Sequence, residues 1–137
     1  MPILEKLRQV VKEFENKKGE FSLVMLIPTE PTLIDSKFTL LISASWLDKE
    51  NQRKGIELIT NCLRRVLNDI EFSYIARVTI IHSSDKSVKA INSAFPVKNS
   101  IFRLANLNVF GVQIDEAILL ESNRVDDSKY IAQNIHA

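Results

Sequence analysis

The sequence predicts one domain of the α/β or α+β class, built on a mixed sheet of about four to five strands. Two extended apolar segments, residues 38–46 and 76–82, flank about 20 residues with helical periodicity. A helix of that length between two strands forms a crossover, which makes the strands parallel. The complete order is helix, strand, strand, helix, strand, helix, and one or two further strands.

Length and composition are those of a single globular domain. The chain has 137 residues, and we place the domain at residues 1–122. Apolar residues make up 45% of the chain and charged residues 26%, which is ordinary for a globular protein. The net charge of +1 does not indicate nucleic acid or an acidic membrane as a partner. Residues 123–137 have a lower apolar density, and we expect a short helix or a disordered C-terminal tail there.

The first half of the chain begins with an amphipathic helix. Pro2 suits the first turn of this helix and Gly19 suits its C-terminal cap. The apolar stripe consists of Ile3, Leu4, Leu7, Val10, Val11 and Phe14. Residues 21–27 then alternate as a strand, with Phe21, Leu23, Met25 and Ile27 on one face. A long polar loop leads to the next strand, and we expect these two strands to be antiparallel neighbours.

The central unit consists of a strand, a helix and a strand. On residues 38–46, one face carries Phe38, Leu40, Ile42, Ala44 and Trp46. Asp48 or Asn51 caps the helix that follows. Its apolar stripe is Ile56, Ile59, Leu63, Val66, Leu67 and Ile70. Gly55 marks either the start of the regular helix or a close packing contact. The second strand covers residues 76–82.

The last part of the chain is predicted to be mostly extended. Ser84 or Asp85 caps a short helix that Pro96 stops. Extended segments then follow at residues 101–104, 109–114 and 117–120. Asn106-Leu107-Asn108 is predicted to turn a hairpin, and Gly111 to form a bulge. We expect residues 117–120 to be a sheet edge that pairs with another chain.

Polar residues gather where the two parallel strands are predicted to end. The loops at residues 46–49 and 82–85 then share one sheet edge, where ligands bind in open α/β sheets. The candidate ligand-binding residues are Trp46, Asp48, His82, Ser83, Ser84 and Asp85. Two helix N-termini open at this edge and favour an anion, while the two aspartates partly offset that field.

Each candidate also has a purely structural interpretation. His82 suits a hydrogen-bonded position at a strand end, and the Trp46 ring suits the core. Helix capping requires only one of the residues from Ser83 to Asp85. The residue types alone do not distinguish these interpretations from ligand binding.

Several kinds of site are not supported by the sequence. The three glycines are isolated, so neither a Walker loop nor a dinucleotide fingerprint is present. One cysteine, Cys62, rules out a disulfide framework and a thiolate zinc cluster, and we expect it to be a small buried hydrophobe. No second histidine lies near His82, so we expect no metal site and no cofactor. No signal peptide and no membrane-spanning run is visible, which predicts a cytoplasmic protein.

Three functional hypotheses follow. The first is an association module without catalysis of its own, a homo-oligomer or an accessory subunit whose partner is itself or another protein. The tail with Tyr130 and Ile131 is a second candidate contact surface for it. The second hypothesis is a small-ligand binder or enzyme that uses the two strand-end loops. The third is nucleic-acid processing through Asp35-Ser36-Lys37 and the basic pairs Lys17-Lys18 and Arg64-Arg65, which otherwise form a solvated surface.

Overall fold

A computed structural model of the chain describes residues 2–30 and 36–123. These residues form five helices and five strands. In chain order they are α1 (Pro2–Lys17), β1 (Leu23–Pro28), β2 (Phe38–Ser43), α2 (Ser45–Asp48), α3 (Gln52–Val66), α4 (Asp69–Ser73), β3 (Ile75–Ile80), α5 (Lys86–Ala94), β4 (Phe102–Val109) and β5 (Val112–Ser122).

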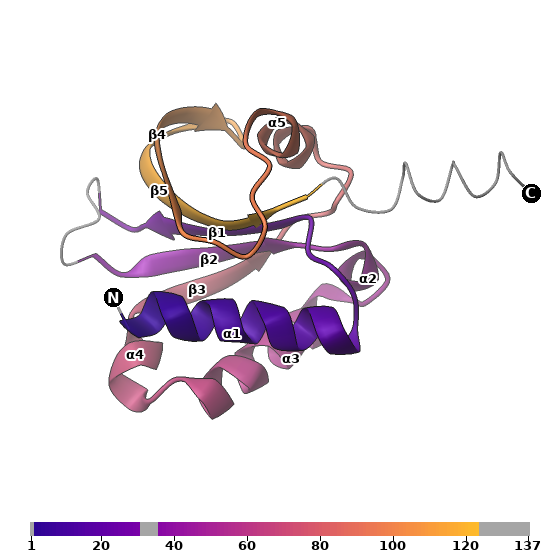
Figure 1. Cartoon of the computed structure of the whole chain (residues 1–137), viewed down its shortest axis with the longest axis vertical. Helices are drawn as coiled ribbons and strands as arrows, with labels where there is room; N and C mark the ends of the chain where they lie inside the picture. The colour runs from indigo at the N-terminus through magenta and orange to yellow at the C-terminus, as the bar shows by residue number, and fades with distance from the viewer. Residues whose placement is uncertain (1, 31–35, 124–137) are drawn as a thin grey trace, which may run out of the picture.

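The five strands form one mixed sheet in the order β3-β2-β1-β5-β4 (Figure 1). Strands β2 and β3 are parallel, and all other neighbours are antiparallel. The parallel pair is joined through α3, as the crossover interpretation predicts. The antiparallel pairing of β1 with β2 across their long loop is also confirmed. The domain is of the mixed α and β class expected from the sequence.

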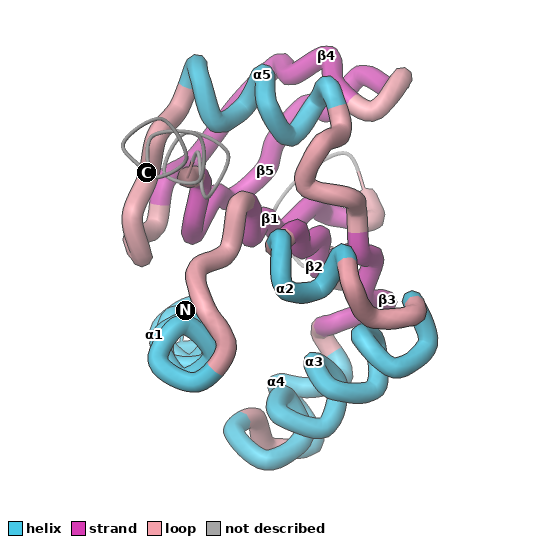
Figure 2. Tube along the Cα trace, turned by 90° about the vertical axis from the view of Figure 1, so that its right-hand side faces the viewer, coloured by secondary structure: helices cyan, strands magenta, loops and turns pink. Residues whose placement is uncertain are grey.

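Helices cover both faces of the sheet. Helices α1 and α3 lie on one face, and α5 lies on the other, where β4 and β5 curl around it (Figures 1 and 2). Each face therefore has its own hydrophobic core. The first core is built around Leu7, Phe14, Leu26, Ile42 and Leu63. The second is built around Met25, Val88, Ile91, Leu107 and Leu119.

Helix α1 agrees closely with its prediction. All six residues of its apolar stripe are buried, and Leu7 is only 2% exposed. The helix ends where the backbone N–H groups of Lys18 and Gly19 both donate to the carbonyl of Phe14, at 2.7 and 3.2 Å. Gly19 has a φ of 132°, a conformation that favours glycine at a helix end.

The long central helix of the prediction is divided in the structure. Asn51 caps α3 by accepting from the Lys54 N–H at 2.8 Å. A new helix, α4, then begins at Asp69, because the preceding Asn68 and Glu71 form a complete capping box. The predicted apolar stripe is wrong at Ile70, which lies in α4 and is 72% exposed.

Gly55 is a site of close packing. A Cβ atom at Gly55 would lie 2.9 Å from Ile80 Cδ1 and 3.4 Å from Leu47 Cδ2. Glycine therefore lets α3 pack closely against Ile80 of β3 and Leu47 of α2. Of the two interpretations considered for this glycine, the structure supports the packing contact.

Strand β2 is shorter than predicted. It ends at Ser43, and the chain turns at once into the short helix α2, which contains Trp46. Trp46 therefore does not continue the strand alternation. The second strand of the unit, β3, likewise ends at Ile80, two residues before the predicted end at His82.

The C-terminal strands differ from the prediction in three ways. The hairpin turns at Phe110 and Gly111, both with positive φ, and not at Asn106–Asn108. Asn106 lies inside β4, with a φ of 56°. Residues 117–120 belong to β5, which lies between β1 and β4 and is not a sheet edge. The outer strands of the sheet are β3 and β4.

Replacing Leu7 with alanine tests whether α1 is part of the core. Leu7→Ala removes a side chain that lies in the first core, and we expect it to lower the free energy of unfolding by about 2 to 5 kcal/mol. Urea unfolding followed by circular dichroism measures this change. Gln9→Ala, at an exposed position of the same helix, is the control. Equal unfolding midpoints for Leu7→Ala and the unsubstituted protein would contradict the packing of α1.

Candidate functional site

The two strand-end loops lie next to each other. Asp48, at the end of α2, accepts the backbone N–H of Ser83 with Oδ1 at 3.1 Å and the Ser83 hydroxyl with Oδ2. This contact joins residues 35 positions apart. The parallel arrangement of β2 and β3 predicts this proximity, and the structure confirms it. The Asp48 side chain is 13% exposed, so the tie is largely shielded from solvent.

His82 lies at the rim of this contact. Its Nδ1 accepts the backbone N–H of Ser84 at 3.1 Å and lies 2.8 Å from the Ser84 hydroxyl oxygen. Because Nδ1 is an acceptor, the neutral imidazole carries its proton on Nε2. Nε2 lies 3.7 Å from Asp48 Oδ2, which is too long for a hydrogen bond. The His82 side chain is 62% exposed.

Asp85 has a capping role. Its carboxylate accepts the Ser87 N–H at 2.8 Å at the start of α5. Asn51 occupies the corresponding position at the start of α3. The N-termini of α3 and α5 therefore already have a side-chain acceptor from their own chain, whereas α2 begins after Ala44 without one. This reduces the positive field that was predicted to favour an anion there.

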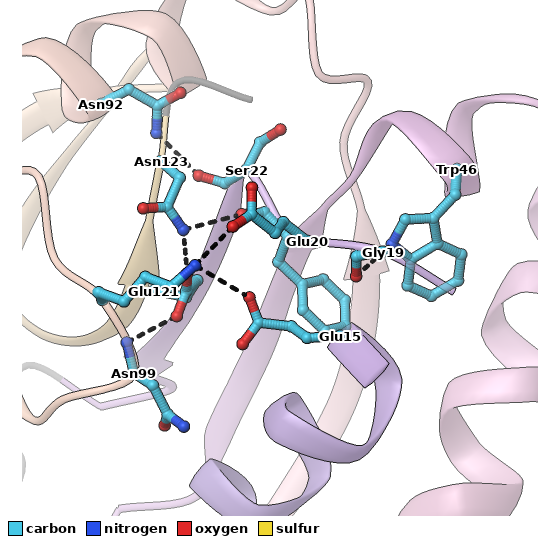
Figure 3. Close-up of polar contacts among 11 residues, drawn as sticks. Glu15, Gly19, Glu20, Ser22, Trp46, Asn92, Asn99, Glu121 and Asn123 are labelled. Carbon is cyan, nitrogen blue, oxygen red and sulfur yellow. Dashed lines mark hydrogen bonds and ion pairs between the residues drawn. The ribbon is translucent and has the colours of Figure 1, made fainter. Parts of the chain in front are cut away.

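The indole of Trp46 packs toward α1 and the start of β1. Its Nε1 donates to the carbonyl of Gly19 at 3.1 Å, as Figure 3 shows. The ring stacks on Phe14 with a centroid distance of 5.6 Å and meets Phe21 edge-on at 5.4 Å. This supports the core interpretation of Trp46. Ligand binding by the six candidate residues stays a prediction.

The residues of the nucleic-acid-processing hypothesis are only partly described. Asp35 lies outside the described residues. Ser36 is buried, and its hydroxyl donates to the Lys37 carbonyl at 2.7 Å and accepts the Glu30 N–H at 3.2 Å. These bonds occupy the hydroxyl within its own loop. Among residues 2–30 and 36–123, no group of three or more histidine, cysteine or acidic side chains is arranged to hold a metal ion.

A second polar cluster lies at the end of the sheet where β2 and β3 end, and it was not predicted. At its centre is Glu121, near the end of β5, whose side chain is completely buried. Its Oε1 accepts the Asn99 N–H at 2.6 Å, and its Oε2 accepts from the Asn123 side-chain amide. The Lys98 ammonium lies 3.9 Å from Glu121, 3.7 Å from Glu15 and 2.6 Å from Glu20. Figure 3 labels these three glutamates.

The surroundings of Glu121 change its proton affinity. Burial raises the pKa of Glu121 to about 7; the Asn99 N–H opposes this rise, and the Glu15 carboxylate adds to it. The hydrogen bond to Glu20 raises the pKa of the Lys98 ammonium, so it stays charged. Glu121 therefore exchanges a proton near neutral pH, a property found both at catalytic carboxyls and at buried structural ones.

Sequence reasoning had a weak signal for this cluster. Glu121 directly follows the apolar run 117–120, which is an unusual place for a carboxylate. Its partners, however, come from α1 and from the loop before β4, and no spacing in the sequence connects them. The antiparallel pairing of β1 with β5 brings α1 to Glu121, and the bridge between Val97 and Ser122 brings the loop before β4 there.

Comparison with protein-family models, with curated proteins and with solved structures finds no match for this chain. Among the described residues, no helix has the length and apolar character needed to cross a membrane. The assignment of a function therefore depends on the geometry of the domain itself.

Replacing Glu121 with glutamine tests its buried charge. A carboxyl whose pKa is raised in the folded state stabilises the fold fully below its unfolded pKa of about 4.5, and this contribution is lost as the pH rises through 7. The loss amounts to about 3 kcal/mol. We therefore expect the free energy of unfolding of the unsubstituted protein to fall by about 3 kcal/mol relative to that of Glu121→Gln as the pH rises from 4.5 to 8, because the variant lacks this part of the pH dependence.

Urea unfolding between pH 4.5 and 8 measures this difference. Asp115→Asn, at an exposed position of the same strand, is the control and should follow the unsubstituted protein. The other carboxyls also make stability depend on pH; Glu71, for example, has a pKa lowered by its hydrogen bond with Lys6. Both proteins contain these carboxyls, so their contribution cancels when the free energy of unfolding of one protein is subtracted from that of the other. An identical pH profile for Glu121→Gln and the unsubstituted protein would contradict the burial of a charge.

Proposed function

We propose that this domain acts by association and forms a homodimer through the outer edge of β3. The observation that carries the proposal is an accessible strand edge flanked by exposed apolar side chains. Among the described residues, β3 pairs only with β2. Ile70 and Tyr74, directly before β3 in the chain, are 72% and 43% exposed. An unpaired strand edge with apolar neighbours favours pairing with another chain.

The residues of β3 suit a pairing strand. Each of its six residues is partly or fully exposed. Val78, Thr79 and Ile80 are β-branched, and the strand contains no proline or glycine. From Arg77 to Ile80 its ladder with β2 is regular, and the register shifts near the start of the strand, at Ala76. At the other end the Ile80 carbonyl accepts from the Gln52 side-chain amide at 3.5 Å. The regular backbone edge that can pair with a second strand is therefore centred on Arg77 to Thr79.

The opposite edge of the sheet is less suitable. Strand β4 also carries an exposed aromatic residue, Phe102. Asn106, however, has left-handed backbone geometry in the middle of β4, and the ladder with β5 skips it. Such an irregularity protects an edge strand against pairing with other chains. We therefore assign the interface to β3.

The charge pattern of β3 favours one register for the pair. Antiparallel pairing centred on Val78 places Arg77 opposite Thr79 of the second copy, with the two side chains on the same face of the joined sheet. Pairing centred on Arg77 would instead place two guanidinium groups opposite each other. The first register joins the two sheets into one continuous sheet with the two α4 helices beside the join.

The earlier expectation of association is thus kept, but with a different surface. Residues 117–120 lie inside the sheet and are not available as an edge. The other surface expected to associate, with Tyr130 and Ile131, lies outside the described residues. The small net charge of +1 offers little repulsion between two copies.

Sedimentation equilibrium over micromolar concentrations tests the homodimer. We expect a dimer for the unsubstituted protein, and a dissociation constant at least about tenfold larger for Ile70→Lys combined with Ala76→Lys, because two exposed interface positions gain a charge. Val112→Lys combined with Gln113→Lys is the matched control, since both residues are exposed at the start of β5 and the variant gains the same two charges. A monomeric unsubstituted protein, or equal disruption by the control, would contradict the β3 interface.

A further inference from the structure

Two basic segments that are distant in the sequence meet at one pocket. The pocket lies between α1 and α3 and has a volume of about 170 Å³. Lys17 and Lys18 line it at the end of α1, and Arg65 lines it from the last turn of α3. The sequence offered these cations as basic pairs, either for nucleic-acid processing or as a solvated surface. The packing of the two helices places three of them around one concave surface.

The remaining lining is largely apolar. Phe14 and Leu58 contribute rings and methyl groups, and Cys62 contributes a thiol from a residue that is 5% exposed. Burial raises the pKa of this thiol, and the Glu13 carboxylate raises it further, so the sulfur is neutral. Asn61 adds an amide that donates hydrogen bonds. The pocket therefore combines an apolar wall with a cationic border.

One carboxylate, Glu13, balances part of this charge. Its Oε1 lies 3.2 Å from Lys17 Nζ and 2.6 Å from Arg65 Nη2. The hydrogen bond from Lys17 lowers the pKa of Glu13, with a further contribution from Arg65, so Glu13 stays ionised. Three cations and one carboxylate among the lining residues leave an excess of two positive charges, 3 − 1 = 2. Glu13 also holds Lys17 and Arg65 at the border.

We propose that this pocket binds a small amphipathic anion, a phosphate or carboxylate group attached to one apolar ring-sized body. The apolar part lies on Phe14 and Leu58, and the anionic group lies toward Lys18 and Arg65. A cavity of about 150 Å³ accepts a benzene molecule, so the volume suits a single ring. A guanidinium and an ammonium group together suit phosphate and carboxylate oxygens. This site is separate from the β3 edge and does not depend on the homodimer.

Phenyl phosphate is the probe, because it carries one ring and one phosphate. Binding is measured by the amide signals of Asn61 and Cys62 in NMR titrations. A second readout is the thermal unfolding midpoint, which a ligand that binds only the folded protein raises. We expect saturable shifts and a higher midpoint with phenyl phosphate, weaker effects with inorganic phosphate, and none with benzylammonium, whose charge is opposite.

Two variants separate the pocket from general electrostatics. Lys18→Glu should weaken phenyl phosphate binding by about five- to tenfold, because it reverses a charge at the border. Arg103→Glu, at an exposed position on β4, makes the same charge change elsewhere and should leave binding unchanged. Leu58→Trp fills the pocket with its ring and should abolish binding while every cation remains. If Leu58→Trp does not fold, the first two variants still decide the question.

Three results would overturn the proposal. The first is no saturable change at Asn61 or Cys62 with phenyl phosphate. The second is equal weakening by Lys18→Glu and Arg103→Glu, which would indicate a non-specific response to charge. The third is a short DNA duplex that shifts the same amides at a lower phosphate concentration than phenyl phosphate does. That result would assign the cationic border to nucleic acid.

Discussion

The parallel crossover from β2 through α3 to β3 is the constraint on which most of this structure depends. A right-handed crossover returns the chain beside β2 only if α3 packs on the face that α1 also covers. Gly55 permits this close approach, since a Cβ there would meet Ile80 at 2.9 Å. The crossover thereby places Asp48 beside Ser83, α3 beside α1, and β3 at the outer edge of the sheet. Three otherwise unrelated features of the surface thus have one geometric origin.

The polar groups at the strand-end edge act mainly as ties between segments. Asp48 joins α2 to the loop after β3, and the buried Asn92 of α5 donates to the Ser22 carbonyl and the Ser122 hydroxyl at 2.8 and 3.0 Å. Lys98 joins carboxylates from α1, from the loop after it and from β5. Buried polar groups require such partners, because an unpaired one costs about 1 to 3 kcal/mol. Glu121 differs from these groups. Both of its carboxylate oxygens accept hydrogen bonds, but burial raises its pKa to about 7, so it exchanges a proton near neutral pH.

Periodicity in the sequence was sufficient for the elements that carry the cores. The stripe of α1, the crossover and the α5 cap are all local or nearest-neighbour patterns, and each was predicted correctly. Two of the errors share a physical cause, which is competition between local signals. Ile70 continues the apolar spacing of α3, but the Asn68–Glu71 capping box starts a new helix before it. Asn106 suited a turn, yet Phe110-Gly111 formed the two-residue hairpin and left Asn106 as an irregularity inside β4.

The features that tertiary packing creates could not be predicted from the sequence, for a different reason. Glu121 and Lys98 are 23 residues apart, and the cations at residues 17, 18 and 65 come from two helices, so no local pattern records their proximity. Where the strand-end groups have mutual partners, they contribute to folding and leave little capacity for a ligand. The cationic border of the α1–α3 pocket and the outer edge of β3 differ from them. In the first, cations outnumber the carboxylate that holds them, and in the second a regular backbone ladder ends beside exposed apolar residues. A functional site is therefore best sought where packing brings together groups that keep capacity to bind a partner or a ligand.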